Sequence, residues 1–384
     1  MTGAPPQRLT PTLRQRLGCW LHERSRAELV LRAPRLAAAF GVGWLDLRNR
    51  GDAIVADDRT GGRDCLWQDS SPLTVGRVFP AVATRLLRHL LAEWPICMAD
   101  AATPVDATSE ETTGVPDVSF LVGIRGTARR PQFEACLASL HGQTGVAHEI
   151  VVVEQSDEPE LAALGSRGVR YVPTGGNGQA YNRSWALNVA ARAARGRLLV
   201  ILDGDMLLPS RFAAACADVM DRSGLRALRP ARFLAYLDPV ASAAVQSQRT
   251  MEAAQVAATD RPVEMIVQNI SNPLVVCRET YLSLGGHDER FVGWGGEDNE
   301  FIDRLRTVDY SEGGFLPVVH LWHASAISAN PHRNRSLLES RLAIPADARI
   351  AELAAAPFGR VDGPVPPASP RDAEPVLPRA GQPA

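Results

Sequence analysis

The stretch LLVILDGDMLLP, residues 198–209, decides how this sequence folds, because an apolar run ends in two acidic residues. Five apolar residues lead directly to Asp203 and Asp205, and the chain becomes apolar again after them. Two like charges beside a buried strand are costly unless a positive group lies next to them. In parallel α/β sheets, ligands bind at the carboxyl ends of the strands. We therefore expect these two acids to mark a binding site at one edge of a sheet.

Three more apolar runs of strand length precede this stretch, with segments of helical periodicity between them. The runs are VSFLVGI (118–124), HEIVVVEQ (148–155) and GVRYVPT (168–174). Helices are expected over about 133–140 and 182–194, and Ser210 is expected to cap another. Each run is apolar throughout rather than at alternate positions. The pattern therefore predicts an α/β fold with a mostly parallel sheet and helices on both faces.

Changes in composition divide the chain into five segments. Residues 1–100 combine helical segments with a strand-like, Gly-rich and Asp-rich middle and contain no chemical motif. Residues 101–116 are small, polar and bounded by proline, which suits a linker. The α/β region follows as two halves, 117–265 and 266–357. Residues 358–384 are rich in proline and are predicted to be a disordered tail.

The charge balance excludes several classes of function. The 384 residues include 41 basic and 43 acidic side chains, so the net charge of −2 provides no general attraction for nucleic acid or an anionic membrane. Every basic residue is an arginine, since the sequence contains no lysine. Schiff-base chemistry, P-loop nucleotide binding and a lysine base are therefore excluded.

Cysteine usage and hydropathy indicate where the protein works. Six cysteines are scattered without a CxxC pair, as expected for buried thiols in a reducing compartment. The N-terminus has no apolar signal core, and no apolar run reaches the ~18 residues of a membrane span. We expect a cytoplasmic protein without a membrane span. The basic amphipathic segment 81–94 is expected to pack in the core, although peripheral membrane contact stays open.

The DGD motif has two interpretations. A solvated turn would account for it without any ligand. A divalent cation would also remove the cost of the paired carboxylates, because hard oxygen ligands suit Mg²⁺ or Mn²⁺ and leave positions for water and a substrate phosphate. The placement of Asp203 and Asp205 at the end of an apolar strand favours the cation.

Two further motifs lie in the second half of the α/β region. GWGGEDNE, residues 293–300, joins a Gly-rich turn and an indole to acids that begin a predicted helix. Such a turn lets a ligand approach the backbone, and the indole offers a flat face to a sugar, but a simple helix cap would have the same composition. HLWH, residues 320–323, ends a strand-like run, and its histidines reach one metal only if the chain bends there.

Together these segments resemble nucleotide-sugar glycosyltransferases of the GT-A fold, over roughly residues 117–345. YNRSWALNVAARAA followed by DGD resembles the bacterial family 2-like core. GGHDERFVGWGGEDNEF resembles the carboxyl-terminal segment of galactosyltransferases and chondroitin-polymerase-type enzymes. The resemblance implies a Rossmann-like GT-A sheet with an N-terminal α+β extension. It also makes 117–265 the nucleotide-sugar-binding half and 266–357 the acceptor and catalytic half.

The resemblance implies roles for five residues in catalysis and metal binding. It assigns Asp205 and His323 to a divalent cation, Mn²⁺ or Mg²⁺, with His320 as a second histidine candidate. It assigns Asp298 to the proton of the acceptor hydroxyl and Glu297 to sugar hydroxyls. An ionised aspartate at a helix N-terminus is stabilised by the helix dipole, which suits a base at neutral pH.

Contacts with the donor and the acceptor sugar are implied in the same way. The residues expected to contact the donor are Ile124, Arg125, Glu154, Arg183 and Asp203, and those expected to contact the acceptor sugar are Trp294, Gly295 and Gly296. Ile124 and Arg125 correspond to the uracil contact at the end of the first strand. The following loop, GIRGTARR, departs from the family, because the usual proline and asparagine are replaced.

The sequence thus predicts transfer of a hexose or N-acetylhexosamine from a UDP-sugar to a glycan, a lipid-linked acceptor or another hydroxyl, with inversion, as in polysaccharide biosynthesis. Three alternatives stay open: a retaining enzyme similar to polypeptide N-acetylgalactosaminyltransferases, a sugar nucleotidyltransferase, and a non-catalytic nucleotide-sugar or glycan-binding protein. The nucleotidyltransferase is suggested by GIRGTARRP, which is similar to a GxGTR loop, but its chemistry relies on lysines. The intact Asp298, His323 and DGD motif disfavour the binding protein.

Overall fold

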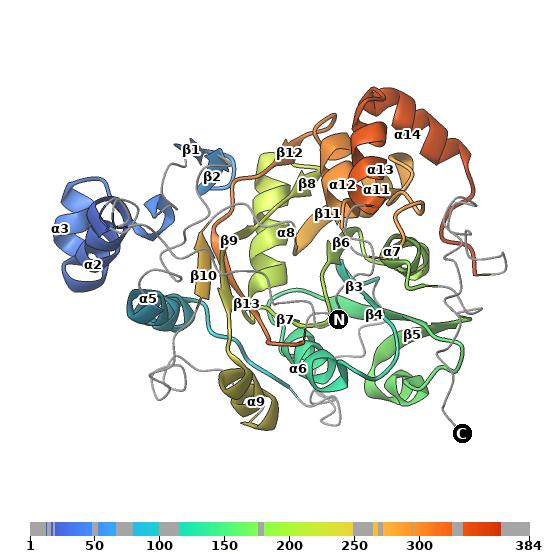
Figure 1. Cartoon of the computed structure of the whole chain (residues 1–384), viewed down its shortest axis with the longest axis horizontal. Helices are drawn as coiled ribbons and strands as arrows, with labels where there is room; N and C mark the ends of the chain where they lie inside the picture. Colours follow the sequence, from blue (N-terminus) through green and yellow to red (C-terminus); the bar gives the residue numbers. More distant parts are fainter. Residues whose placement is uncertain are drawn as a thin grey trace, which may run out of the picture.

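A seven-stranded mixed sheet forms the centre of the structure (Figure 1). The computed structural model describes residues 13, 17, 20–47, 53–66, 80–99, 115–175, 180–248, 264–267, 272–293, 295–324 and 333–361. The strands of the sheet, in chain order, are β3 (Val118–Ile124), β4 (His148–Gln155), β5 (Val169–Thr174), β6 (Leu198–Ile201), β8 (Ala227–Leu228), β11 (Leu274–Cys277) and β12 (Tyr310–Ser311). Their order across the sheet is β12-β8-β11-β6-β3-β4-β5.

Four adjacent strands of this sheet run parallel. β3 pairs in parallel with both β4 and β6, and β4 pairs in parallel with β5, whereas β11 is antiparallel to β6 and β8. The prediction of a mixed, mostly parallel sheet is therefore confirmed. Since β6 lies next to β3 at the centre of the sheet, the DGD motif that follows β6 lies near the middle of the edge formed by the carboxyl ends of the parallel strands.

Helices cover both faces of the sheet because alternate strand residues point to opposite sides. On β3, Phe120 and Val122 pack with Phe133 and other residues of α6 and α8. Leu121 packs on the other face with Trp185 of α7. The helices are α6 (Arg130–His141), α7 (Arg183–Ala193), α8 (Phe212–Ser223), α9 (Pro239–Gln248), α11 (Arg278–Ser283), α12 (Glu297–Leu305), α13 (Arg333–Leu342) and α14 (Ala346–Ala355), with a short 3₁₀ helix η3 (Ala162–Arg167).

A four-stranded sheet packs beside the first and joins it to the N-terminal region. Its order is β10-β9-β13-β7, with bounds β7 (Met206–Leu207), β9 (Ala231–Tyr236), β10 (Glu264–Val267) and β13 (Leu316–His320). The N-terminal elements are η1 (Trp20–Arg24), α2 (Ser25–Arg32), α3 (Pro34–Ala39), η2 (Trp44–Asp46), the hairpin β1 (Ala53–Asp57) and β2 (Gly62–Leu66), and α5 (Pro80–Glu93). Leu86 and Leu90 of α5 share a core with Phe233 and Val319 of this sheet. The expectation of core packing for segment 81–94 is therefore confirmed.

Three local expectations differ from the structure. Ser210 does not cap α8, because its hydroxyl instead donates to the carbonyl of Pro95 at 3.1 Å and ties the helix start to the N-terminal region. The tail predicted from Phe358 begins with packed residues, since Phe358 is buried and its carbonyl accepts from Arg192. Of the four cysteines described as free, Cys97 is exposed rather than buried.

Parts of the predicted organisation fall on residues that the structure does not describe. Residues 101–114 of the linker and 362–384 of the tail lie outside the described ranges. Within the described ranges, none of the helices combines the length and the hydropathy that crossing a membrane requires.

Candidate active site

The DGD loop joins β6 to β7 and gives its two acids different surroundings. Asp205 is buried, and its carbonyl accepts the N–H of Leu321 at 2.9 Å. The side chain of Asp203 is 44% exposed. A Cβ on Gly204 would come within 3.1 Å of the Phe133 ring, so glycine lets the loop pass closely over α6. Asp205 is thus held inside the protein, while Asp203 is accessible.

Asp205 lies in a cluster with His320 and His323, the three residues that the resemblance named for metal binding. Nε2 of His320 is 3.5 Å from Oδ1 of Asp205, and Nε2 of His323 is 3.2 Å from Oδ2. The ligand atoms of the three residues all lie within 4.8 Å of one another. β13 ends at His320, and the chain then leaves the strand direction, so His323 reaches the same carboxylate. That the cluster binds a metal stays a prediction.

The chemistry of this cluster fits a divalent cation. Oδ1 of Asp205 is buried without a hydrogen-bond partner among the described residues, so it is available to a ligand. Burial raises the pKa of Asp205, but the nearby His323, His320 and Arg129 outweigh burial and lower it. The carboxylate is therefore ionised at neutral pH. One carboxylate and two imidazoles would leave coordination positions for a diphosphate and water.

Arg129 belongs to this site, although the sequence analysis missed it. It lies just before α6, and its Nη1 donates to Oδ2 of Asp205 at 3.2 Å. A signal was present, because GIRGTARR places several arginines in the loop between the first strand and its helix. A fixed guanidinium at this position would attract an anionic group of a ligand.

Arg183 links the DGD loop to the acids of the WGGED loop. From the start of α7, its Nε donates to Oδ1 of Asp203 at 2.8 Å and its Nη1 to Oδ1 of Asp298 at 2.9 Å. Glu297 lies 3.8 Å from Nη1. Asn272, which was not predicted, donates to Oδ2 of Asp298 at 2.9 Å and to Oδ2 of Asp203 at 3.5 Å. Residues far apart in the chain therefore form one polar cluster next to the Asp205 cluster.

Glu297 and Asp298 are neighbours whose pKa values shift in opposite directions. Burial raises the pKa of Asp298, but its neighbours, with the Arg183 guanidinium first among them, outweigh burial, and the net pKa is lowered. Burial raises the pKa of Glu297 to about 7, and the adjacent Asp298 carboxylate adds to this rise. Near neutral pH, Asp298 is ionised, while Glu297 is protonated in part of the molecules. Such a divergence is typical of paired acids with separate roles.

The raised pKa of Glu297 predicts that Glu297→Gln weakens the pH dependence of folding stability. Its carboxyl titrates near the ordinary 4.5 when unfolded and near 7 when folded. The contribution of this carboxyl to the free energy of unfolding is therefore fully present below about pH 4.5 and is lost as pH rises through about 7. Glutamine does not titrate, so wild type should lose roughly 1–3 kcal/mol more than the variant between about pH 5 and 8. Urea unfolding at both pH values measures this, and equal losses would contradict the assigned pKa.

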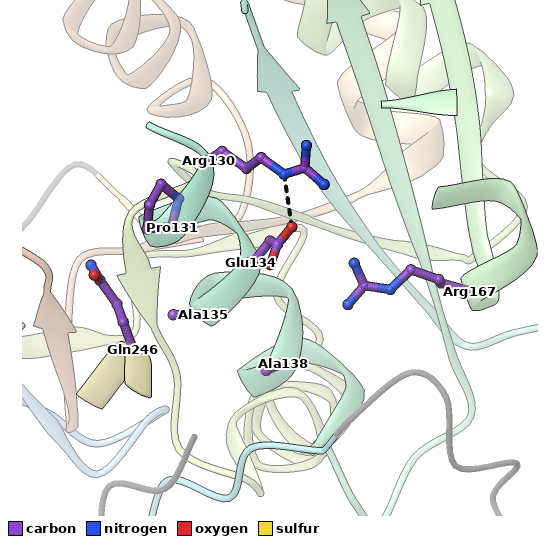
Figure 2. Close-up of a pocket in the computed structure, with 7 residues that line it drawn as sticks. All are labelled: Arg130, Pro131, Glu134, Ala135, Ala138, Arg167 and Gln246. Carbon is purple, nitrogen blue, oxygen red and sulfur yellow. Dashed lines mark hydrogen bonds and ion pairs between the residues drawn. The ribbon is translucent and has the colours of Figure 1, made fainter. Parts of the chain in front are cut away.

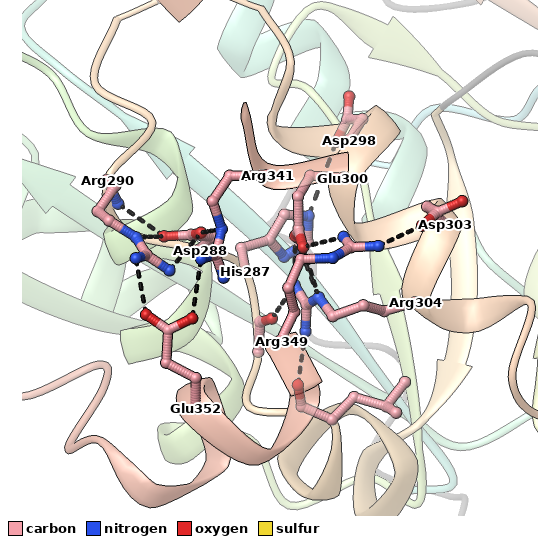
Figure 3. A network of polar contacts seen from close by, with 12 residues as sticks. His287, Asp288, Arg290, Asp298, Glu300, Asp303, Arg304, Arg341, Arg349 and Glu352 are labelled. Carbon is pink, nitrogen blue, oxygen red and sulfur yellow. Dashed lines mark hydrogen bonds and ion pairs between the residues drawn. The ribbon is translucent and has the colours of Figure 1, made fainter. Parts of the chain in front are cut away.

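A buried network of ion pairs holds α12 against the turn that precedes the WGGED loop (Figure 3). Glu300 of α12 accepts from Arg304 at 2.7 Å and from Arg349 of α14 at 2.6 Å. Arg304 also donates to the carbonyls of Leu284 at 2.5 Å and Gly286 at 2.8 Å. These charges are fully buried, so removing one partner would leave an uncompensated charge. The network therefore keeps residues 284–286 in place beside the helix that carries Asp298.

The glycines before α12 shape the backbone at its N-terminus. Gly296 has a φ of 94°, and a Cβ there would come within 2.8 Å of the Phe291 ring, so the position requires glycine. Gly295 has a φ of 95°. The turn places Glu297 at the first position of α12. Trp294, which was expected to contact the acceptor sugar, lies outside the described residues.

The remaining predicted donor contacts are Ile124, Arg125 and Glu154, at or just after the carboxyl ends of β3 and β4. Ile124 is buried at the end of β3, and Arg125 follows it on the surface. Glu154 is fully buried, and its carboxylate accepts two backbone N–H groups of the segment after β4 and the hydroxyl of Tyr171. These contacts anchor that segment to the sheet. A donor role for these three residues stays a prediction.

A groove of about 250 Å³ lies along the outer side of α6 (Figure 2). It is lined by Arg130, Pro131, Glu134, Ala135, Ala138, Arg167 and Gln246. Arg130 and Glu134 form an exposed ion pair at 2.9 Å within it. None of the predicted site residues lines this groove, so it is separate from the two clusters.

Comparison with known proteins identifies one segment of the chain. Residues 272–316 match the family model described as the N-terminal domain of galactosyltransferase. This range contains Asn272, Glu297 and Asp298, and it includes GGHDERFVGWGGEDNEF, so the predicted resemblance is confirmed. No protein of curated function matches the sequence significantly.

Two solved structures are similar at low identity. TarS residues 1–349 of S. aureus, in complex with UDP, has 11% identity and a TM-score of 0.41, covering 62% of this chain and 70% of that one. The mannosyltransferase PcManGT of Pyrobaculum calidifontis, in complex with GDP-Man and Mn²⁺, has 17% identity and a TM-score of 0.35, covering 73% of this chain and 76% of that one.

Proposed function

We propose that this glycosyltransferase depends on a divalent cation and transfers a hexose or N-acetylhexosamine from a UDP-sugar to a hydroxyl acceptor, with inversion. The observation that carries the proposal is the position of the DGD loop between two clusters. Asp205 lies with His320 and His323. Asp203 pairs with Arg183, which also holds Asp298. Ligands for a cation and a candidate base thus lie on either side of one three-residue loop.

The residues around Asp205 suit a departing diphosphate. Asp205, His320 and His323 would hold Mn²⁺ or Mg²⁺, which when bound neutralises the charge that develops on the leaving group. Arg129 adds a fixed positive charge 3.2 Å from Asp205. Asp203, oriented by Arg183, is the donor-side acid that we assign to the ribose or sugar hydroxyls.

Asp298 is the residue that we assign as the base. Transfer needs a carboxylate beside the attacking hydroxyl to take its proton. The lowered pKa keeps Asp298 ionised at neutral pH, and Arg183 and Asn272 each hold one of its oxygens at 2.9 Å. Glu297, with a pKa of about 7, retains a proton that it can donate to a sugar hydroxyl. A base on the opposite side from the leaving group suits in-line displacement with inversion.

The alternatives to inverting transfer make different demands on the site. A sugar nucleotidyltransferase must bind a triphosphate, for which its chemistry relies on lysines that this chain lacks. A protein that only binds sugars has no need of adjacent carboxyl groups with opposed pKa values. A retaining glycosyltransferase has the same fold and cation site, so only the stereochemistry of the product separates it from our proposal.

The proposal predicts that UDP release requires a divalent cation. The purified chain is incubated with UDP-linked Gal, GalNAc, Glc or GlcNAc, and with Mn²⁺, Mg²⁺ or a chelator. We expect UDP release from at least one donor with a cation, and a loss of about 100-fold or more with the chelator, because the diphosphate then leaves unneutralised. GDP-mannose is the matched control for the nucleotide, and little GDP should be released from it.

Two results of this assay would contradict the proposal. UDP release that is unchanged by the chelator would show that the reaction does not need a cation. Pyrophosphate release from UTP and a sugar phosphate would indicate a nucleotidyltransferase. Proton NMR of the freshly released sugar then reports the stereochemistry, and the anomeric configuration should be opposite to that of the donor. Retention would exclude Asp298 as a base acting directly on the acceptor.

A further inference from the structure

His287 is buried beside Asp298, and the function proposed above gives it no role. The residue is 1% exposed and lies in the turn held by the ion-pair network. Its Nε2 is 3.7 Å from Oδ1 of Asp298. This nitrogen is buried and has no hydrogen-bond partner among the described residues. A buried polar atom without a partner destabilises the fold, so its position next to the candidate base needs an explanation.

Contacts on all sides hold the imidazole ring in this orientation. The ring stacks on Phe301 of α12, with centroids 4.4 Å apart and an interplanar angle of 28°. Nδ1 lies 2.9 Å from the hydroxyl of Tyr281, and the backbone N–H donates to Oδ1 of Asn188 at 2.8 Å. Turning Nε2 away from Asp298 would break the contact of Nδ1 with Tyr281. Figure 3 shows the side chain of His287 directed toward Asp298.

The hydrogen bonds of Tyr281 determine which nitrogen of His287 carries the proton. The Tyr281 hydroxyl has one hydrogen and donates it to Oδ1 of Asn188 at 2.6 Å. The tyrosine oxygen can then only accept a hydrogen bond from Nδ1 of His287, so Nδ1 must carry a hydrogen. In a neutral ring the other nitrogen, Nε2, is left with a free lone pair that faces Asp298.

The charges around His287 keep the ring neutral. Burial lowers the pKa of His287, and the guanidinium groups of Arg183 and Arg304 lower it further, whereas the Asp298 carboxylate raises it. The net pKa is below the ordinary 6.5, so the ring is uncharged at neutral pH. A lone pair rather than an N–H therefore faces the carboxylate of Asp298.

We propose that His287 is a positioning residue for Asp298, whose Nε2 accepts a hydrogen bond from Asp298 when that carboxylate has taken the acceptor proton. The inference rests on the proposed function. In the step itself, the acceptor oxygen bonds to the anomeric carbon, the bond from that carbon to the diphosphate oxygen breaks, and the hydroxyl proton moves to Asp298. The separation of 3.7 Å exceeds a hydrogen bond and would shorten once Asp298 is protonated.

The other partners of Asp298 explain why such an acceptor is useful. Nη1 of Arg183 and Nδ2 of Asn272 both donate, so they stabilise the ionised carboxylate and weaken it as a base. His287 with a free lone pair favours the protonated carboxyl instead. A hydrogen on Nε2 would have the opposite effect, because it would stabilise the carboxylate and lower the pKa of Asp298. Whether Nε2 of His287 carries a lone pair or a hydrogen therefore decides whether the residue favours the protonated or the ionised form of Asp298.

Two substitutions test the role of the acceptor nitrogen. In His287→Phe the ring still packs on Phe301, and Tyr281 keeps its bond to Asn188, but no acceptor faces Asp298. We expect kcat to fall about 10- to 100-fold, while the KM for the donor stays within about twofold. His287→Gln supplies a carbonyl oxygen and should stay within about fivefold of wild type. Equal kcat values for His287→Phe and wild type, or equal losses in both variants, would overturn the proposal.

A spectroscopic test is independent of activity. Long-range ¹H–¹⁵N correlation spectra of the full chain, labelled at its eight histidines, distinguish the two neutral tautomers. The signals of His287 are those absent in His287→Gln. We expect the tautomer with hydrogen on Nδ1, and hydrogen on Nε2 would overturn the proposal.

Asp298→Asn separates failure of this inference from failure of the proposed function. If Asp298→Asn abolishes transfer while His287→Phe has none of the expected effect, only the inference about His287 is wrong. If Asp298→Asn is fully active, the assignment of the base is itself wrong.

Discussion

Asp298→Asn is expected to lower the rate of transfer by about 10³-fold and to leave the affinity for the UDP-sugar nearly unchanged. Asparagine has the same shape and can still accept from Arg183, which also keeps its ion pair with Asp203. It cannot take the proton of the acceptor hydroxyl. Single-turnover transfer at saturating donor measures the chemical step, and titration with UDP measures donor binding separately.

Asp218→Asn is the matched control for this variant. Asp218 lies on α8, its side chain is 64% exposed, and it pairs on the surface with Arg222 of the same helix. The control removes the same charge outside the site and should keep the wild-type rate. An Asp298→Asn variant with the wild-type rate would show that another group, such as the adjacent Glu297, takes the proton.

Asp205→Ala is expected to weaken cation binding by at least about 100-fold and to abolish transfer with it. Both histidines of the cluster face the Asp205 carboxylate, and Oδ1 is left without another partner. The variant removes the single carboxylate of the cluster and the charge that Arg129 faces. Calorimetric titration with Mn²⁺ measures the affinity, and thermal unfolding checks that the variant folds.

Asp203→Ala, two residues earlier, tests the division of roles within the DGD loop. Asp203 is absent from the cluster of candidate cation ligands and pairs with Arg183. We expect its variant to bind Mn²⁺ within about threefold of wild type and to have a higher KM for the donor. Equal losses of Mn²⁺ affinity in the two variants would show that both acids bind the cation.

The sheet could be predicted because its signal is local. The apolar runs at 118–124, 148–155 and 198–202 are visible in the sequence and become β3, β4 and β6. The acids of the site could also be recognised as motifs, since their neighbours in the chain are glycines in a fixed pattern. Periodicity and short motifs need no knowledge of what packs against them.

Arg129 and Asn272 were missed because their importance comes from residues distant in the chain. Arg129 meets Asp205 across 76 positions, and Asn272 meets Asp298 across 26. GIRGTARR marks a loop with several arginines but does not single out Arg129 among them, and no pattern in the sequence distinguishes Asn272. Ser210 shows the reverse case, because a sound local signal for a helix cap was overridden by a tertiary contact with Pro95.

By itself, the sequence determined the mostly parallel sheet, the edge at which a ligand is expected to bind, and the residue types available there. It could not decide the different states of Glu297 and Asp298, which are adjacent acids at the start of one helix. The tertiary structure decided them by placing Arg183, 115 positions away, 2.9 Å from Asp298 and by burying Glu297. The pKa of a carboxyl depends on its burial and on the charges within a few ångströms, and only the folded chain sets those distances.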